Sequence, residues 1–425
     1  MGNNSGKKEC DPCEKNLDEL FGAISNKKGY ILRSDLKKVW AGQIDEDLYN
    51  DIELYLFKAN QNNLTSQTFK KLFSDICKGT TEDKVDVLCK LMGDRDEISR
   101  SRLLKFVTNI LNSILIIQKT KSPKRYNSWC ERIGNKKPTE SITELSTYFL
   151  DRVAKQDQDE FMRDDLASLI IHFDFYLHMV LSRMYDTEEK HFYTCVLPEW
   201  KSSPVDAGKT LNQFSILNLC KIMFLNSELP IDYQHKWRPL FSTEIHGESF
   251  SKLSGQILNQ GPTLIIIKDK DGYVFGGFAP SSWSLGPIFS GDSRSFLFTL
   301  EPNMNLFVAT NFNSNYQYMN VSQQTMPNGL GFGGKLEYFG LWISAEFGKG
   351  YCSESCTTYR EYKMMSKNKE FDIAHLEVWA VGPPPLSPSE LGERSVLDSN
   401  IEAKAILEMA GKTAYSDGLR EEPID

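Results

Sequence analysis

Long hydrophobic runs are missing from this sequence. A helix that crosses a bilayer needs about 18 or more consecutive apolar residues, and the best candidate, residues 103–117, is interrupted by Lys105, Asn109 and Asn112. The first residues are polar and contain no apolar segment of the kind that secretory signals carry. We therefore expect a cytoplasmic protein that is at most peripheral on a membrane.

Excess positive charge is also absent. The formal net charge is −8, whereas binding to a phosphate backbone requires a basic surface, so we expect no nucleic acid partner. The cysteines number nine and are scattered over 425 residues, which is typical of free thiols in a reducing compartment. A chain of this length that is 40% hydrophobic can form two or three domains with substantial cores.

Recognisable catalytic motifs are lacking. The sequence contains no GxSxG nucleophile elbow and no P-loop. Residues 329–334 have the glycine spacing of a dinucleotide fingerprint, but that motif needs a following helix, and residues 336–343 are typical of a strand. Close backbone packing within a β region explains these glycines better. We therefore predict a protein that is not an enzyme and uses no cofactor or metal.

Two cysteines support an alternative hypothesis. Cys352 and Cys356 are four positions apart, but no second pair of Cys or His residues completes a zinc site. A reactive thiol needs exposure and a lowered pKa, and only Lys349 and Arg360 supply positive charge nearby. The alternative function is an oxidative-stress protection factor with such a thiol.

Residues 16–185 are predicted to be helical, because apolar residues recur every three to four positions. The three clearest stripes are Phe69, Leu72, Phe73 and Ile76; Leu103, Phe106, Val107, Ile110, Leu111, Ile114 and Leu115; and Leu166, Leu169, Ile170, Phe173, Leu177, Val180 and Leu181. Each stripe needs a partner surface to cover it.

Polar turns separate these predicted helices, and four of them share a shape. They are residues 26–31, 60–64, 93–98 and 156–161. In each, an apolar residue follows the turn and precedes a helix, as in an EF-hand. Calcium requires oxygen ligands at fixed positions, yet the first loop aligns Ile24 and Lys28 at ligand positions, and the fourth aligns Ala154. We predict an EF-hand-like region that is calcium-free.

The pattern changes after about residue 225. Short β-branched or aromatic runs, separated by turn residues, are typical of strands, and they cover residues 263–267, 273–275, 295–300, 306–309 and 376–381. Asp269–Gly272 is predicted to be a hairpin turn in which Gly272 has a positive φ. The fold class is therefore α+β, with residues 186–225 as a connecting helical segment.

Both ends of the chain carry candidate contact segments. Residues 1–15 form a flexible tail in which Gly2 is a myristate acceptor, although Gly6 stands where the motif has Ser or Thr. One acyl chain needs a second signal to hold a membrane stably. A predicted basic loop has two interpretations: it supplies that second signal, or it is a solvated loop between helices. Its residues are Lys119, Lys121, Lys124, Arg125, Arg132, Lys136 and Lys137. Residues 383–425 combine a Pro-rich linker with a short C-terminal helix.

Residues 226–382 resemble a TLDc domain. The matching segments are 237–250, 276–279, 340–343, 350–357 and 371–379. The resemblance implies a β-sandwich of two antiparallel sheets edged by helices, with no established catalytic activity. It also implies binding to the peripheral sector of the vacuolar proton-pumping ATPase, association with the lysosomal membrane, support of mTOR signalling and a link to oxidative-stress resistance.

The expected role is thus that of a lysosome-associated adaptor. Two weak contacts joined by a linker can give avidity that neither has alone. The candidate partner-binding residues are Glu244, His246 and Gly247 in the TLDc domain and Leu397, Ile401 and Met409 in the C-terminal helix. This helix either packs back on the sheet or lies in a partner's groove, and we favour the partner.

Overall fold

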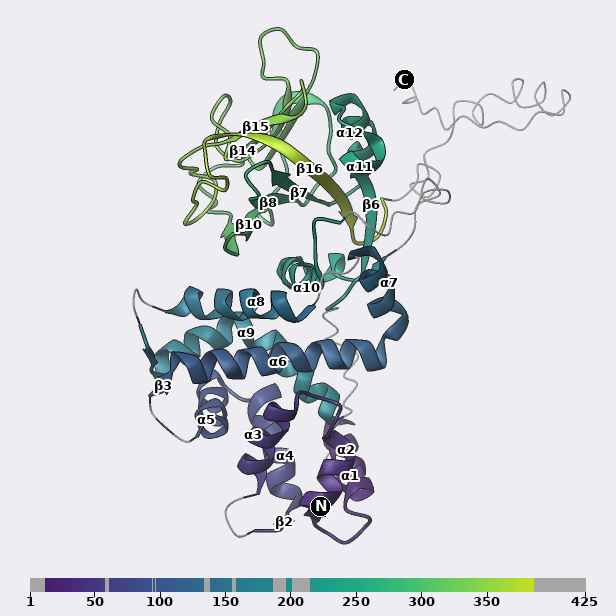
Figure 1. Cartoon of the computed structure of the whole chain (residues 1–425), viewed down its shortest axis with the longest axis vertical. Coiled ribbons are helices and arrows are strands. Elements are labelled where there is room, and N and C mark those ends of the chain that lie inside the picture. Colours follow the sequence, from purple (N-terminus) through teal and green to yellow (C-terminus); the bar gives the residue numbers. More distant parts are fainter. Residues whose placement is uncertain are drawn as a thin grey trace, which may run out of the picture.

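The computed structural model describes residues 12–57, 61–93, 95, 97–133, 138–154, 158–185, 196–200 and 215–385. Helices form one half of the molecule and a sheet forms the other, with α10 (Leu219–Glu228) between them (Figure 1). The predicted α+β class is confirmed. Gly2, Leu397, Ile401 and Met409 lie outside the described residues.

Nine helices account for most of the described N-terminal half. They are α1 (Pro12–Ile24), α2 (Arg33–Trp40), α3 (Glu46–Leu56), α4 (Ser66–Cys77), α5 (Thr81–Leu91), α6 (Arg100–Lys121), α7 (Pro123–Ile133), α8 (Pro138–Val153) and α9 (Arg163–Met184). Side chains that accept hydrogen bonds from free N–H groups begin several of them, such as Asp45 for α3 and Thr80 for α5.

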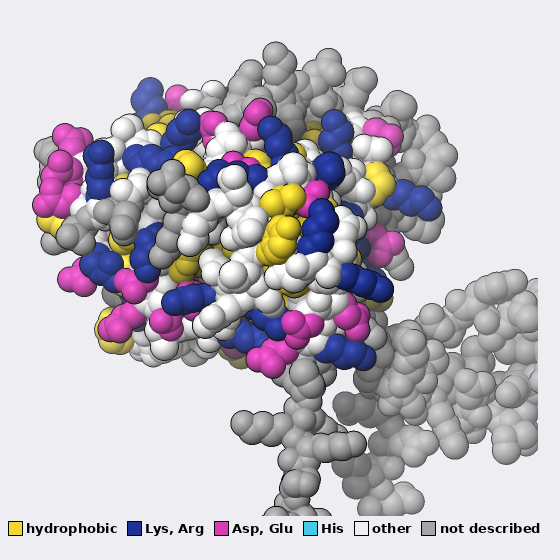
Figure 2. All heavy atoms as spheres, turned by 90° about the horizontal axis from the view of Figure 1, so that it is seen from below, with side chains coloured by type: hydrophobic (Ala, Val, Ile, Leu, Met, Phe, Trp, Pro, Cys, Tyr) yellow, Lys and Arg dark blue, Asp and Glu magenta, His cyan; other side chains and the backbone are white. Residues whose placement is uncertain are grey.

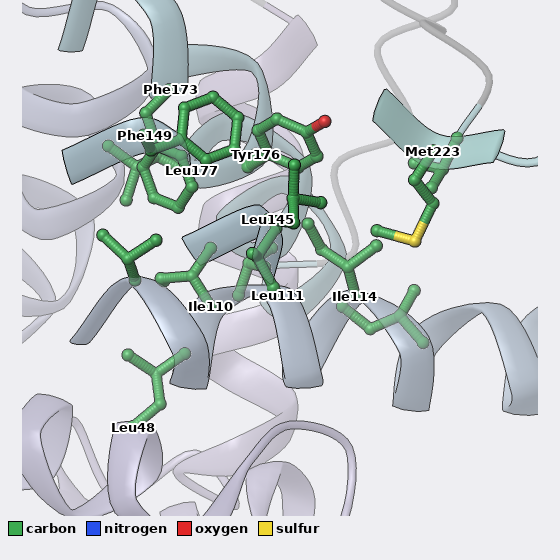
Figure 3. Packing of buried hydrophobic residues seen from close by; sticks show 14 of the residues in the cluster. Leu48, Ile110, Leu111, Ile114, Leu145, Phe149, Phe173, Tyr176, Leu177 and Met223 are labelled. Carbon is green, nitrogen blue, oxygen red and sulfur yellow. The ribbon is translucent and has the colours of Figure 1, made fainter. Parts of the chain in front are cut away.

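The three predicted apolar stripes lie on α4, α6 and α9, and all of their residues are buried. Figure 3 shows Ile110, Leu111 and Ile114 of α6 pointing toward side chains of α8 and α9, namely Leu145, Phe149, Phe173, Tyr176 and Leu177. The recurrence of apolar residues thus predicted both the helices and the faces that they bury.

The four predicted turns form two pairs. β1 (Ile31–Leu32) pairs antiparallel with β2 (Asn63–Leu64), and β3 (Ile98–Ser99) pairs with β4 (Glu160–Phe161). Ile31 lies opposite Leu64, and Ile98 opposite Phe161, so the apolar residues that follow the turns meet in the core. The EF-hand-like shape is confirmed for the described parts of these loops.

After residue 196, besides α10 and the 3-10 helix Ile231–Tyr233, the described chain contains two short α-helices and most of the strands. They are β5 (Glu199–Trp200), β6 (Lys236–Ser242), α11 (Thr243–His246), α12 (Phe250–Ile257), β7 (Thr263–Asp269), β8 (Val274–Ala279), β9 (Gly286–Ser290), β10 (Phe296–Glu301), β11 (Asn305–Val308), β12 (Gln317–Asn320), β13 (Gly329–Phe332), β14 (Leu341–Ser344), β15 (Lys349–Cys352) and β16 (Glu370–Val381). The predicted hairpin joins β7 to β8, and Gly272 has a φ of 90°.

Strand β16 joins two layers. Its later residues pair with β7 and β6 in the first layer, whose order is β11-β10-β8-β7-β16-β6, with β5 beside β6. Its first residues pair with β15 in the second layer, whose order is β16-β15-β14-β13-β12-β9. The layers pack face to face: the ring centroid of Phe275 in β8 lies 5.0 Å from that of Phe371 at the start of β16, and an added Cβ at Gly277 of β8 would lie 3.1 Å from the Phe332 ring of β13. The result is the β-sandwich that the resemblance implied.

The helical half covers the outer face of the first layer, and one hydrophobic core runs through both. At this joint Trp129 of α7, Trp237 of β6 and Trp379 of β16 contact one another at 5.4–5.9 Å between ring centroids. Their indole N–H groups donate to Pro198 O, Asn226 Oδ1 and Glu377 Oε2, respectively. Because each buried donor has an acceptor, the aromatic cluster incurs no desolvation penalty from unpaired N–H groups.

The basic loop and the connecting segment differ from the sequence-based expectation. The prediction of a basic loop is wrong for its described residues. Lys119 and Lys121 end α6, and Lys124 and Arg125 begin α7. Pro123 starts the new helix at the position that proline favours. Within 186–225, the described residues include strand β5 as well as α10, and α10 continues past the expected boundary at 226.

Candidate docking site

The predicted contact residues Glu244, His246 and Gly247 lie at a corner of the sandwich, where β6 runs into α11. Glu244 and Gly247 are exposed, and Gly247 has a φ of 76°, a conformation that favours glycine. His246 stacks on Phe241 at 5.3 Å and its Nδ1 lies 3.1 Å from the N of Ser242. The corner is therefore a fixed structure that presents a carboxylate to solvent.

Beneath this corner lies a polar cluster whose geometry differs from a catalytic triad. The Oγ of Ser242 and the Oε1 of Glu377 lie 3.1 and 3.7 Å from the same nitrogen, Nε2 of His375. In a triad the hydroxyl and the carboxylate contact different ring nitrogens. The buried Glu377 instead accepts from the N of Ile216 and the Oγ of Ser215, and so fixes that segment to β16.

The thiols of Cys352 and Cys356 are both buried. Burial raises the pKa of Cys352 to about 12, and it also raises the pKa of Cys356. A reactive cysteine needs the opposite conditions, namely exposure and a lowered pKa. This geometry weighs against a peroxide-reactive thiol at either position.

Arginines of α2 and α6 reach the helix ends that lead into two of the EF-hand-like loops. Arg33 donates to the carbonyl oxygen of Phe57 at 3.1 Å, and Arg102 donates to that of Leu91 at 3.1 Å and to Oδ1 of Asp51 at 2.7 Å. Phe57 and Leu91 end the helices that enter the second and third loops, where free carbonyls carry partial negative charge. At each of these helix ends a guanidinium therefore offsets the partial negative charge of the free carbonyls.

Next to the fourth loop, a carboxylate of α9 accepts hydrogen bonds from protein groups. Oδ2 of Asp165 accepts from Nε2 of Gln158 at 2.7 Å and from the N of Met162 at 2.9 Å. Across the described chain, no group of three or more His, Cys, Asp or Glu residues is placed to hold a metal ion. The described loops are thus held by internal hydrogen bonds.

The glycines of residues 329–334 serve packing. An added Cβ at Gly329 would lie 2.5 Å from Cζ2 of Trp342, and one at Gly331 would lie 2.5 Å from Cδ1 of Phe339. β13 is followed by a turn and then by β14. The interpretation as close backbone approach is confirmed, although β14 begins only at Leu341 and not at residue 336.

Charges of both signs are interspersed on the face of the helical half that Figure 2 shows, with apolar patches between them. Such a surface lacks the single-sign field that concentrates a polyanion. Among the described residues, no helix is both long and apolar enough to cross a membrane.

The outer face of the second layer was not predicted from the sequence. Alternate residues of β14, β15 and β16 line a groove of about 570 Å³ there, including Trp342, Lys349, Tyr351 and Glu370. The signal was present in the alternation of polar or large side chains with buried ones at Lys349–Tyr351 and Glu370–Asp372, which is typical of a sheet with one exposed face.

Comparison with known proteins gives two levels of similarity. Residues 210–382 match the family model of the TLDc domain. The MTOR-associated protein MEAK7 of Xenopus laevis is 37% identical over 382 residues, which cover 84% of this chain and 81% of that protein. The human MTOR-associated protein MEAK7 is 32% identical over 96% of this chain and 95% of its own length. Mouse nuclear receptor coactivator 7 is 32% identical, but over only 39% of this chain.

Proposed function

This chain belongs to the TLDc-domain family, together with the MTOR-associated proteins MEAK7, and from that premise we propose that it is a non-catalytic adaptor in mTOR signalling. Its direct partner in this proposal is the peripheral sector of the vacuolar proton-pumping ATPase at the lysosomal membrane. The main support is similarity to relatives named for mTOR association along nearly their whole length. The names of these relatives are not those of enzymes.

The exposed corner formed by Glu244, His246 and Gly247 is the proposed contact of the sandwich with the pump. We expect Glu244→Lys to reduce co-purification of pump subunits several-fold, because charge reversal in an interface places like charges together. Glu354→Lys is the matched control, since Glu354 is also exposed but lies outside the corner. Equal losses in both variants would contradict this assignment.

The C-terminal segment is the proposed second contact, through Leu397, Ile401 and Met409. Deleting residues 391–425 removes the avidity of a two-point attachment, so pump association should weaken sharply. Unchanged co-purification would remove this part of the proposal.

Membrane attachment is proposed to combine a myristoyl group on Gly2 with basic side chains at the end of α6 and the start of α7. Gly2→Ala should shift the protein from the lysosomal to the soluble fraction. Neutralising Lys119, Lys121, Lys124 and Arg125 should produce a smaller shift that grows with salt concentration, because exposed charges are screened. Membrane binding that neither change affects would exclude this mode.

Oxidative-stress protection through a thiol is the second candidate. The burial and raised pKa values of Cys352 and Cys356 disfavour it. A Cys352→Ser, Cys356→Ser variant discriminates the two functions: an adaptor keeps its pump association, whereas a thiol enzyme loses its protection against peroxide. Thermal unfolding of the variant serves as the folding control.

A further inference from the structure

The open groove on the second layer crosses β15 and β16. It extends from Trp342 and Ser344 of β14 to Lys270 and Asp271 in the hairpin between β7 and β8. We propose that this groove binds an extended segment of a partner protein in which an arginine and an acidic residue stand two positions apart. This contact is separate from the corner at Glu244.

The groove has a rigid aromatic wall. Trp342 lies opposite Tyr351, and Tyr351 opposite Glu370, in the strand register, so the three side chains form a row on one face. Phe339 stacks against the Trp342 ring at 4.4 Å with an interplanar angle of 19°. Only 8% of Trp342 is exposed. Trp342 therefore supports the half-exposed Tyr351, whose ring centroid lies 6.3 Å away. A supported ring costs little entropy on binding, and its face favours a planar group such as a guanidinium.

Some charged groups of the groove form ion pairs within the protein and others do not. Lys270 Nζ lies 3.4 Å from Oδ2 of Asp372, and Asp271 lies 3.9 Å from Lys367 just outside. The carboxylate of Glu370 and the ammonium of Lys349 form no ion pair with any residue of the described chain, and both are exposed. They are the groups that remain for a ligand.

Each of these groups fits one kind of side chain. Glu370 adjoins Tyr351, where an arginine can stack on the ring and bond the carboxylate at the same time. Lys349 is suited to an acidic side chain. Because Glu370 lies opposite Tyr351, the arginine gains a ring contact as well as an ion pair, so the arginine is the anchor.

The spacing of the two free charges matches an extended ligand. Lys349 lies opposite Asp372, and Glu370 opposite Tyr351, so Lys349 and Glu370 are diagonal neighbours about 7–8 Å apart. Side chains two positions apart on one side of an extended strand are separated by roughly 6.5–7 Å. An arginine and an acid at this spacing can therefore reach both groups together.

The test measures binding of a fluorescein-labelled peptide, Gly-Thr-Arg-Thr-Glu-Thr-amide, to the full chain by fluorescence anisotropy. We expect Glu370→Gln to weaken binding about fivefold, the size of a partly exposed ion pair. A peptide with Gln in place of Arg should bind equally weakly to both proteins. Lys349→Gln should also weaken binding of the original peptide. This effect should disappear when Gln replaces Glu in the peptide.

Glu346→Gln is the matched control, because Glu346 is an exposed acid in the turn between β14 and β15 and does not line the groove. It should leave binding unchanged. The proposal is overturned if the peptide does not bind, if Glu370→Gln has no effect, or if the peptide without arginine binds as well as the original. Pump association is assayed separately, so either result stands without the other.

Discussion

The two layers of the sandwich differ in what covers their outer faces. In the first layer, all six residues of β8 are buried, because the second layer lies against one face and the helical half against the other. In the second layer, β15 alternates between exposed or half-exposed and buried residues. The domain thus uses one layer to bind its own N-terminal half and presents the other to solvent.

Strand β16 shows this contrast within a single element. Over residues 370–373 its side chains alternate between exposed and buried, whereas residues 376–381 are all buried. The change occurs where the strand passes from the second layer to the first. Candidate contacts with partners therefore lie on the open layer and at the corner, while the joint serves stability.

The largest expected effect is at the joint. Trp237→Ala should lower the free energy of unfolding by about 3–5 kcal/mol, because it leaves a cavity in the shared core. Ile288→Ala on β9, a residue that is 79% exposed, should cost less than about 0.5 kcal/mol. Urea denaturation followed by circular dichroism measures both. Similar losses at the two sites would contradict the division into a covered and an open layer.

An intermediate effect is expected in the helical half, far from the joint. Arg102→Ala removes the bonds to Leu91 O and Asp51, and should cost about 1.5–3 kcal/mol as expected for bonds to a charged group. Arg100 pairs with the exposed Asp151, so Arg100→Ala should cost less than about 1 kcal/mol. Added calcium should restore neither variant. Recovery of Arg102→Ala in calcium would show that the loop binds the ion.

The smallest expected effect concerns Glu228 at the end of α10, on the helical side of the joint. Burial raises the pKa of this carboxyl to about 7 from 4.5, so the folded state retains a proton that the unfolded state loses. The free energy of unfolding should therefore fall between pH 4.5 and 7, by about 1 kcal/mol for a partly exposed group, and stay constant above.

Glu228→Gln should remove this dependence, because the amide does not titrate. The difference in stability between wild type and variant, measured at pH 5 and pH 8, isolates the contribution of this residue from that of the other carboxylates. An unchanged difference would show that Glu228 is ionised in the folded protein at both values.

Periodicity predicted the elements well where packing is local. The stripes of α4, α6 and α9 and the four polar turns followed from the spacing of apolar residues, because a helix buries the residues that recur every three to four positions. The hairpin at Gly272 followed from its turn residues. These features depend on neighbours in the sequence.

Features that depend on distant contacts were not predictable. Arg102 engages Asp51 from a helix 51 positions later in the chain, and nothing in the local pattern distinguishes it from a solvated arginine. The same holds for the helices that cover the first layer. The interpretation of Glu244, His246 and Gly247 came from the family resemblance, so their role stays a prediction. Lys349 and Glu370 belong to an alternation of exposed and buried residues that was present in the sequence but was not used to predict a site.

Strand β16 also sets an order of events during protein synthesis. It is the last strand of the described chain, yet it lies between β7 and β6 in one layer and continues beside β15 in the other. Until the ribosome has released it, both layers have unpaired edges and the apolar face of the helical half has no complete sheet to cover. We expect the nascent chain to require chaperones during this interval, since exposed edges and apolar surfaces promote aggregation.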